Sequence, residues 1–201
     1  MNKGVLCDGI YYCEHIGMLS QDDEDIRDFC VKYRRHTIGL ENYIKYSSFS
    51  DEEIGLMRTY IVRDVKTDEM VGYFSLKAGL VSLNEREIQN THGTNEIVFD
   101  TAPGVEVANY AMNERYCEAH PETKGIGILI FRHFIQILVR QVAEIVGARV
   151  LYIFALPIDS LIERYRNIYG FRRFDAESEF AIHKRIKPIY DKSCIFMYQL
   201  L

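Results

Sequence analysis

A lysine and two glycines stand immediately before a long apolar run, in the stretch ETKGIGILIF at residues 122–131. Glycine leaves backbone N–H groups unshielded, and a helix that begins with such groups can bind phosphate. Gly125 and Gly127 complete neither standard phosphate motif, because no Lys-Ser/Thr pair follows them and the chain continues with Leu129 and Ile130 in place of a third glycine. The pattern alone leaves two interpretations open, a phosphate site or the end of a loop.

Cysteines and histidines offer little further chemistry. Cys117 and His120 have the spacing of a metal-binding pair, but no second pair accompanies them, so we expect no metal site. The five cysteines are an odd number without a CxxC pair, which indicates reduced thiols and a cytoplasmic protein. The segment 1–15 shows no apolar core followed by a cleavage site, so we expect no export signal.

Length, charge and apolar runs restrict the class of protein. A chain of 201 residues with 48% hydrophobic residues is long enough to form a single domain over 1–201. The formal net charge of −5 and the pI of about 5.7 argue against a nucleic-acid partner held by a broad basic surface. Arg132, His133 and Arg140 interrupt the longest apolar run, so we expect no membrane span.

The first half of the chain predicts helices followed by a hairpin. Apolar residues recur at helical spacing over 21–36, which predicts an amphipathic helix, and a shorter helix is expected over 39–47. Two β-rich runs flank the turn residues 66–69 and predict the hairpin. The polar stretch 82–104 is long for a connection, and we expect either a mobile loop on the substrate side or an irregular surface flap.

The second half alternates strands and helices. GVEVANYAMN predicts a strand at 105–113, and the helix that follows the two glycines is expected to end at Gly147 as a C-cap. ARVLYIFAL predicts a strand buried on both faces, followed by a helix in PIDSLIERYRNIYG and a last strand in CIFMYQLL. This order predicts an α/β fold with a parallel strand–helix–strand crossover.

Three motifs in this order resemble the Gcn5-related N-acetyltransferase superfamily, with the likeness covering residues 55–200. They are the central-strand stretch Tyr110-Ala111-Met112, the glycines of [QR]-x-x-G-x-[GA] in ETKGIG, and the Tyr and Gly-Phe of RYRNIYGF. The resemblance implies a mixed, splayed sheet of about six to seven strands flanked by helices. It also implies that 1–54 is a helical region on the acceptor side, and that acetyl-CoA is the cofactor, released as coenzyme A.

The same resemblance assigns cofactor-binding residues. The backbones of Ala111, Met112 and Asn113 are expected to pair with the pantetheine arm. The loop is expected to hold the pyrophosphate through Lys124, Gly125, Ile126, Gly127 and Ile128. Three positions depart from the family pattern: Glu122 replaces Gln or Arg, Asp159 replaces an Asn that touches the cofactor, and Arg166 replaces a Tyr. Lys124 is then expected to supply the missing cation, and Asp159 remains a candidate contact.

Acetyl transfer to an amine needs a base, a donor to the developing oxyanion and a proton for the leaving thiolate. The resemblance gives the oxyanion to a backbone N–H near Met112. Arg166 occupies the position of the family's tyrosine, and the hydroxyls nearest to it in the sequence belong to Tyr165 and Tyr169. Tyr165 is the candidate proton donor, although it also belongs to an apolar helical stripe. Glu106 is the candidate base, and an ordinary strand charge is the alternative.

The sequence therefore predicts an acetyl-CoA-dependent N-acetyltransferase that acts on a primary amine of a small molecule or peptide. Two alternatives stay open, a non-catalytic acetyl-CoA-binding or sensor domain and a toxin-like acetyltransferase of aminoacyl-tRNA. The acidic balance argues against the last, although local basic patches such as Arg34-Arg35 or Arg172-Arg173 could serve it. A homodimer is an option that the sequence leaves open.

Overall fold

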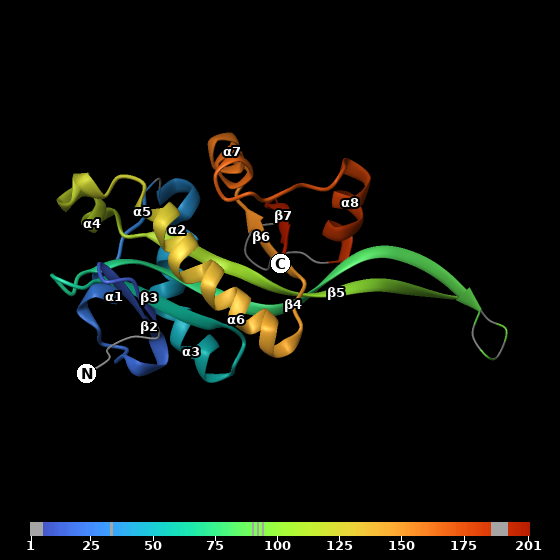
Figure 1. Ribbon diagram of the computed structural model, residues 1–201, viewed down its shortest axis with the longest axis horizontal. Helices are drawn as coiled ribbons and strands as arrows, with labels where there is room; N and C mark the ends of the chain where they lie inside the picture. Colours follow the sequence, from blue (N-terminus) through green and yellow to red (C-terminus); the bar gives the residue numbers. More distant parts are fainter. Residues whose placement is uncertain (1–5, 33, 90, 92, 94, 186–192) are drawn as a thin grey trace. The chain divides into compact units, whose positions relative to one another are not determined.

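The computed structural model describes residues 6–32, 34–89, 91, 93, 95–185 and 193–201. Within these residues one sheet contains seven strands, hydrogen-bonded in chain order (Figure 1): β1 Leu6–Cys7, β2 Tyr11–His15, β3 Arg58–Asp64, β4 Met70–Gln89, β5 Asn95–Met112, β6 Val150–Ala155 and β7 Ile195–Leu200. β5 and β6 run parallel, whereas β1–β2, β2–β3, β3–β4 and β6–β7 run antiparallel. The predicted mixed α/β sheet is confirmed.

Short helices and two longer helical runs surround these strands. The α-helices are α1 Glu24–Asp28, α2 Arg34–Asn42, α3 Ser48–Glu53, α4 Glu114–Ala119, α5 Ile126–Ile130, α6 Gln136–Val146, α7 Asp159–Asn167 and α8 Ala176–Arg185. A wider π turn, Tyr43–Ser47, joins α2 to α3, and another, Phe131–Ile135, joins α5 to α6. The second join produces one continuous helix over Ile126–Val146.

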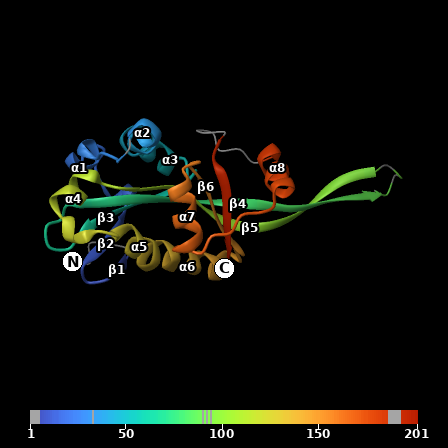
Figure 2. The same cartoon turned by 90° about the horizontal axis from the view of Figure 1, so that it is seen from above.

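The chain divides into two compact units. The first comprises Met1–Lys77 with Val107–Val139, and the second comprises Ala78–Glu106 with Arg140–Leu201. β4, β5 and the long helix contribute residues to both units. In the first unit, α1, α2 and α3 lie on one side of the strands and α5 lies on the other (Figure 2).

The core of the first unit joins its N-terminal helices to the sheet. Apolar side chains that are at most 8% exposed pack together from both, namely Ile16, Ile26, Phe29, Val31 and Ile44 with Ile61, Met70, Tyr73 and Ala111. Burial of each large side chain contributes about 1.5–3 kcal/mol. The Tyr73 hydroxyl donates to the Leu40 carbonyl at 2.6 Å, so that its polar end is satisfied as well. The core therefore includes Ala111, a residue of the candidate cofactor strand.

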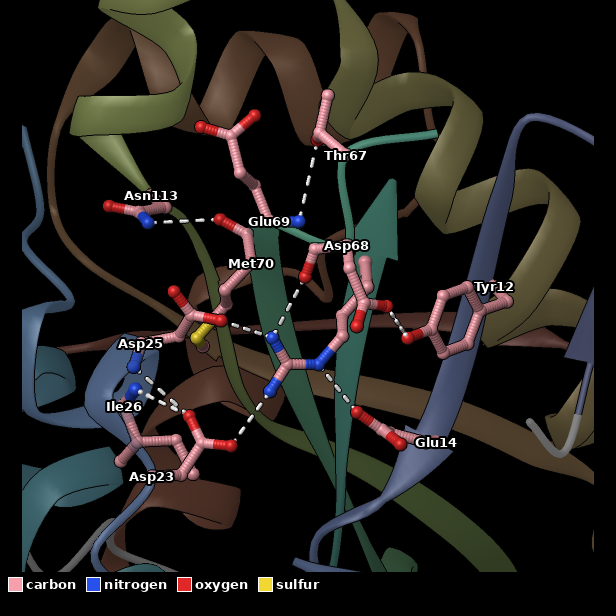
Figure 3. A network of polar contacts seen from close by, with 11 residues as sticks. Tyr12, Glu14, Asp23, Asp25, Ile26, Thr67, Asp68, Glu69, Met70 and Asn113 are labelled. Carbon is pink, nitrogen blue, oxygen red and sulfur yellow. Dashed lines mark hydrogen bonds and ion pairs between the residues drawn. The ribbon is translucent and has the colours of Figure 1, made fainter. Parts of the chain in front are cut away.

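A buried arginine ties three elements of this unit together (Figure 3). Arg63 on β3 is 6% exposed, and its guanidinium donates to Glu14 at 2.5 Å, to Asp23 at 2.9 Å and to Asp25. It also donates to the Asp68 carbonyl at 3.0 Å. Asp23 caps α1 through its other carboxylate oxygen. One side chain thus connects β2, the start of α1 and the turn between β3 and β4.

The core of the second unit is built around Tyr152 on β6. A Cβ on Gly79 would lie 1.9 Å from the Tyr152 hydroxyl oxygen, and a Cβ on Gly104 would lie 3.2 Å from its ring. Gly79 therefore makes room for the tyrosine hydroxyl, whereas at Gly104 a Cβ would also lie 2.8 Å from the Val150 carbonyl oxygen. The Tyr152 ring stacks on Phe196 of β7, with centroids 5.5 Å apart, and α8 adds Ile182 to the same core.

The predicted helix over 21–36 is wrong in its extent. α1 ends at Asp28, and α2 begins separately at Arg34. Phe29 is fully buried in the core, and the Cys30 carbonyl accepts from the Glu114 N–H at 2.9 Å. These contacts with distant parts of the chain are made by non-helical backbone between α1 and α2. Of the apolar residues at helical spacing, Ile26 and Phe29 are buried, Cys30 is half-buried, and Tyr33 lies outside the described residues.

The expectation of a loop or flap over 82–104 is also wrong. β4 continues to Gln89 and β5 begins at Asn95, so most of this stretch is a two-stranded ribbon. The register of β4 with β3 ends at Leu76, and that of β5 with β6 begins at Gly104. A two-stranded ribbon satisfies its backbone hydrogen bonds without burying a full face, so its composition resembles that of a loop.

The other predicted elements are present, including the 66–69 hairpin, the parallel crossover and the last strand. Gly147, with φ of +76°, follows α6 as the predicted C-cap. The patterns did not predict β1, β2, α4 or α8.

The helix Ile126–Val146 is long and apolar enough to cross a membrane by length and composition, so composition alone does not exclude a span. A buried core helix passes the same test, and Phe131 and Phe134 are buried.

Candidate cofactor loop and active site

The two glycines of the candidate cofactor loop begin the long helix. Gly125 caps α5 with φ of +92°, a left-handed conformation that favours glycine. The Ile128 N–H donates to the Gly125 carbonyl at 2.8 Å. The N–H groups of Gly125, Ile126 and Gly127 have no acceptor among the described residues. Three N–H donors at the positive end of a helix can therefore bind an anion.

Tyr110 holds this helix start against the central strand. Its hydroxyl donates to the carbonyl of Gly127, and its ring lies 6.3 Å from that of Phe131. Ile126 and Ile130 are buried on the same first turns. The position of the loop is therefore fixed by β5, within one compact unit. Tyr110 was not singled out as a site residue, because nothing in the sequence distinguishes a strand tyrosine that faces the loop.

The residues before the loop form a chain of ion pairs. His120 lies 3.0 Å from Glu69 and 3.5 Å from Glu122, and its ring is tilted against that of Tyr116 with centroids 4.4 Å apart. The hydrogen bond to Glu69 raises the pKa of His120. Glu122, which replaces the usual Gln or Arg, thus lies beside an imidazole that is cationic when protonated. Lys124 is exposed and makes no ion pair within the described residues.

Asn113 fastens the end of β5 to β4. Its backbone N–H donates to the Val71 carbonyl at 2.9 Å, and its side-chain amide donates to the Met70 carbonyl at 2.9 Å (Figure 3). Successive residues of a strand direct their N–H groups to opposite sides, so the Met112 N–H points away from β4. This is the edge on which a ligand is expected to meet the backbone of Ala111–Asn113.

Glu106 marks the end of the ladder between β5 and β6. The register of these strands comprises Gly104↔Val150, Val105↔Leu151 and Glu106↔Tyr152. Beyond it, β6 continues only against β7. The register with β6 thus ends before the candidate cofactor residues Ala111–Asn113. Glu106 is 8% exposed and interacts with other groups, so it is a buried carboxylate rather than a solvated strand charge.

Tyr165 lies on α7 in a cluster of aromatic rings. Its ring centroid is 5.4 Å from that of Tyr169 and 5.7 Å from that of Phe171, which it meets edge-on. Burial raises the pKa of Tyr165, so the phenol keeps its proton near neutral pH. In the part of the chain that the structure describes, its hydroxyl has no hydrogen-bond partner. Other tyrosine hydroxyls are engaged, among them those of Tyr12, Tyr43, Tyr73, Tyr110 and Tyr116.

The predicted site residues fall into two groups, one in each unit. Ala111–Asn113 and Lys124–Ile128 belong to the first unit, whereas Glu106, Asp159 and Tyr165 belong to the second. Asp159 is exposed in the first turn of α7. No group of three or more metal-ligating side chains occurs among the described residues. The groups that these predicted residues offer are backbone N–H groups, the carboxylates of Glu106 and Asp159, the Lys124 ammonium and the Tyr165 hydroxyl.

The chain has the fold of the Gcn5-related N-acetyltransferases. Its sequence matches no protein-family model and no curated protein. A Tyr-to-Phe mutant of KacT is 16% identical, with a TM-score of 0.62 over 95% of this chain and 95% of that chain. A Tyr-to-Phe mutant of the AtaT toxin, bound to the C-terminus of the antitoxin AtaR and acetyl-CoA, is 15% identical, with a TM-score of 0.59 over 94% and 92%. Such low identity establishes the fold alone.

Nucleic acid is present in further structures of these toxins. AtaT complexed with acetyl-methionyl-tRNA is 15% identical, with a TM-score of 0.59 over 92% of this chain and 93% of that chain. A KacTA–DNA complex is 15% identical, with a TM-score of 0.54 over 94% and 92%. We expected a small-molecule or peptide amine as the acceptor and no nucleic-acid partner. These complexes contradict that expectation, which is therefore wrong. Net charge averages over the whole chain and does not report the charge of one face.

Proposed function

We propose that the protein is an acetyl-CoA-dependent N-acetyltransferase whose acceptor is the amino group of an aminoacyl-tRNA. The observation that carries the proposal is the helix start at Gly125, where three successive N–H groups have no acceptor among the described residues. These donors suit the pyrophosphate of coenzyme A, since a helix N-terminus stabilises a nearby anion by about 0.3–1 kcal/mol. Exposed Lys124 adds a cation beside them.

Three groups of this chain cover the chemical requirements of the transfer. Glu106 accepts the proton that the amine loses as its nitrogen bonds to the thioester carbonyl carbon. The backbone N–H of Met112 donates to the carbonyl oxygen while negative charge develops there. Tyr165 gives its proton to the sulfur as the carbon–sulfur bond breaks, and it regains a proton from solvent.

The acceptor is inferred from the structural neighbours. AtaT was solved with acetyl-methionyl-tRNA, which carries an acetyl group on an aminoacylated tRNA. AtaT and KacT were also solved as Tyr-to-Phe mutants, the substitution that tests Tyr165 in this chain. A match over 95% of this chain and of KacT supports one domain over 1–201. An aminoacyl-tRNA acceptor would place the protein in the cytoplasm.

Transfer of labelled acetyl from acetyl-CoA to a mixture of aminoacyl-tRNAs tests the proposal. We expect label on the amino acids that are released from tRNA by mild base, and none on uncharged tRNA or free amino acids. A protein that binds acetyl-CoA but labels no aminoacyl-tRNA would instead be a non-catalytic acetyl-CoA-binding domain. The departures at Glu122, Asp159 and Arg166 are the observation that favours this second candidate.

A further inference from the structure

Gly72 of β4 lies against the peptide group that joins Ala111 to Met112 on β5. A Cβ at Gly72 would stand 2.6 Å from the Ala111 carbonyl oxygen and 3.2 Å from the Met112 Cα. A Cβ atom essentially never makes contacts shorter than 3.0 Å, and backbone cannot rotate away as the end of a side chain can. The close approach of β4 to β5 at this point therefore requires a residue without a side chain.

The carbonyl that Gly72 contacts and the candidate oxyanion donor belong to one peptide group. A trans peptide group is planar, and its C=O and N–H bonds point in opposite directions. With the Ala111 carbonyl against Gly72, the Met112 N–H is directed away from that contact. A side chain at position 72 would displace the carbonyl and, in the same rigid plane, the N–H donor.

A β-bulge adjoins this contact. The register of β3 with β4 passes from Gly72 to Met70 between two consecutive residues of β3, so Val71 is an additional residue in β4. The Val71 carbonyl accepts from the Asn113 N–H, and the Met70 carbonyl accepts from the Asn113 side chain, both at 2.9 Å. Three successive residues of β4 therefore hold the end of β5, all within the first unit.

We propose that Gly72 is a positioning residue for acetyl transfer, because it lets β4 hold the Ala111–Met112 peptide where its N–H donates to the thioester oxygen. The inference rests on the proposed function, which assigns the oxyanion to this N–H. Gly72→Ala should lower kcat roughly 10- to 100-fold, because a displacement of about 1 Å near the reacting atoms can cost about 100-fold in rate. Kd for coenzyme A should change less than about threefold, because the N–H groups of Gly125–Gly127 that suit its pyrophosphate are left in place.

Selective isotope labelling of methionine amides observes the donor directly by NMR, since the chain contains only six methionines. In wild type, acetyl-CoA should shift the Met112 amide signal beyond the shift that coenzyme A produces, because only the thioester places a carbonyl oxygen at the donor. Gly72→Ala should lose this acetyl-dependent difference. Gly79→Ala is the matched control, since it also adds a Cβ to β4, but against the Tyr152 hydroxyl in the second unit, and it should keep the difference.

A second pair of variants tests the same peptide without adding a side chain to β4. Asn113→Ala keeps the backbone bond to Val71 but removes the donation to Met70, and it should also lower kcat more than it weakens binding of coenzyme A. Asn109→Ala is its control, because Asn109 is buried on the same strand and its side chain contacts the Met57 sulfur at 3.7 Å. This control should leave the Met112 signal and the ratio of kcat to Kd unchanged.

The outcomes separate this inference from the proposed function. If the Met112 signal of Gly72→Ala still responds to the acetyl group, or if wild type shows no such response, Gly72 does not position the donor, even where aminoacyl-tRNA is acetylated. Equal losses in kcat and in affinity would indicate a merely structural glycine and also overturn the inference. If Gly72→Ala does not fold, wild-type kcat in Asn113→Ala overturns it instead. If the acetyl-dependent shift depends on Gly72 but no aminoacyl-tRNA is acetylated, the inference stands and the proposed acceptor is wrong.

Discussion

At the scale of single residues, the surroundings of Tyr165 separate it from the tyrosines that serve only the core. Its ring packs on Tyr169 and Phe171, as the apolar stripe of its helix predicts. Its hydroxyl nevertheless has no partner among the described residues, while five other tyrosine hydroxyls hold structural hydrogen bonds. A packed ring that presents a protonated hydroxyl is what a fixed general acid requires. Packing and catalysis are therefore compatible roles for this side chain.

Tyr165→Phe should lower kcat about 100-fold and leave KM for acetyl-CoA nearly unchanged, because the lost proton transfer occurs only in the transition state. Steady-state kinetics with an aminoacyl-tRNA acceptor measure both constants. Tyr169→Phe is the matched control and should keep most of the rate. Loss of rate in Tyr169→Phe alone would move the proton donor one turn along the helix, and unchanged rates in both variants would remove the tyrosine from the mechanism.

Glu106→Gln should depress the rate most below about pH 8, because the α-amino group of an acceptor has an ordinary pKa of about 7.7–8.0 and needs a base only while protonated. A pH–rate profile of kcat/KM for wild type and variant makes the comparison. An equal loss at every pH would indicate that the buried carboxylate is structural, and no loss at any pH would exclude it as the base.

At the scale of elements, a buried arginine is bound to the residues that begin α1. Arg63 joins Glu14 on β2 to Asp23, which caps α1. Removing one partner of a buried network leaves uncompensated charge, which is more costly than losing a surface pair. The start of α1 therefore depends on a residue of β3 forty positions away.

Arg63→Met should destabilise the protein by about 3–5 kcal/mol, because Glu14 and Asp23 would lose their cation in a buried site. Arg115→Gln breaks an exposed pair with Asp28 and should cost no more than about 1 kcal/mol. Urea unfolding of both variants provides the comparison. Equal, small losses would mean that water reaches the Arg63 network and screens it.

His120 fastens the end of α4 to the β3–β4 turn through Glu69. Because its pKa is raised in the folded state, the pair stabilises the protein below the ordinary histidine pKa of about 6.5, and this contribution is lost as pH rises through the raised value. Below the ordinary pKa of Glu69, whose pKa is lowered, the contribution fades again. His120→Gln should therefore melt below wild type near pH 6 and match it at pH 8.5. A constant difference across thermal melts at both pH values would contradict the ion pair.

At the scale of the whole molecule, ligand binding should appear as stability. Acetyl-CoA at a hundredfold excess over Kd stabilises the folded state by about 2.7 kcal/mol, which raises Tm by roughly 5–10 °C for a chain of this size. Gly127→Val places a branched side chain at the loop and should abolish the shift without unfolding the free protein. Pantetheine without phosphates should give a much smaller shift in wild type. If acetyl-CoA does not raise the Tm of the wild-type protein, the two glycines only end a loop and the enzymatic proposal is wrong.

The sequence by itself determined the helices, strands and caps that depend on residues close together in the chain. The alternation in β5, the apolar run of β6 and the cap at Gly147 each depend on residues within a few positions, because strand pleat, burial on both faces and left-handed backbone are properties of short segments. The glycines at 125 and 127 likewise place the loop at a helix start. Order and spacing of such elements sufficed to predict the mixed sheet and its parallel crossover.

Tertiary structure decided what depends on residues far apart in the chain. α1 ends at Asp28 because Phe29 packs into a core that includes Tyr73. The 82–104 stretch is a ribbon because β4 and β5 are hydrogen-bonded to each other. Tyr110 reaches the Gly127 carbonyl only once strand and helix are packed. Arg164, Arg166 and Arg172 are exposed and form no ion pair within the described residues, which their positions in the sequence do not predict. Composition counts charges and apolar groups, whereas only the packed chain sets which of them meet.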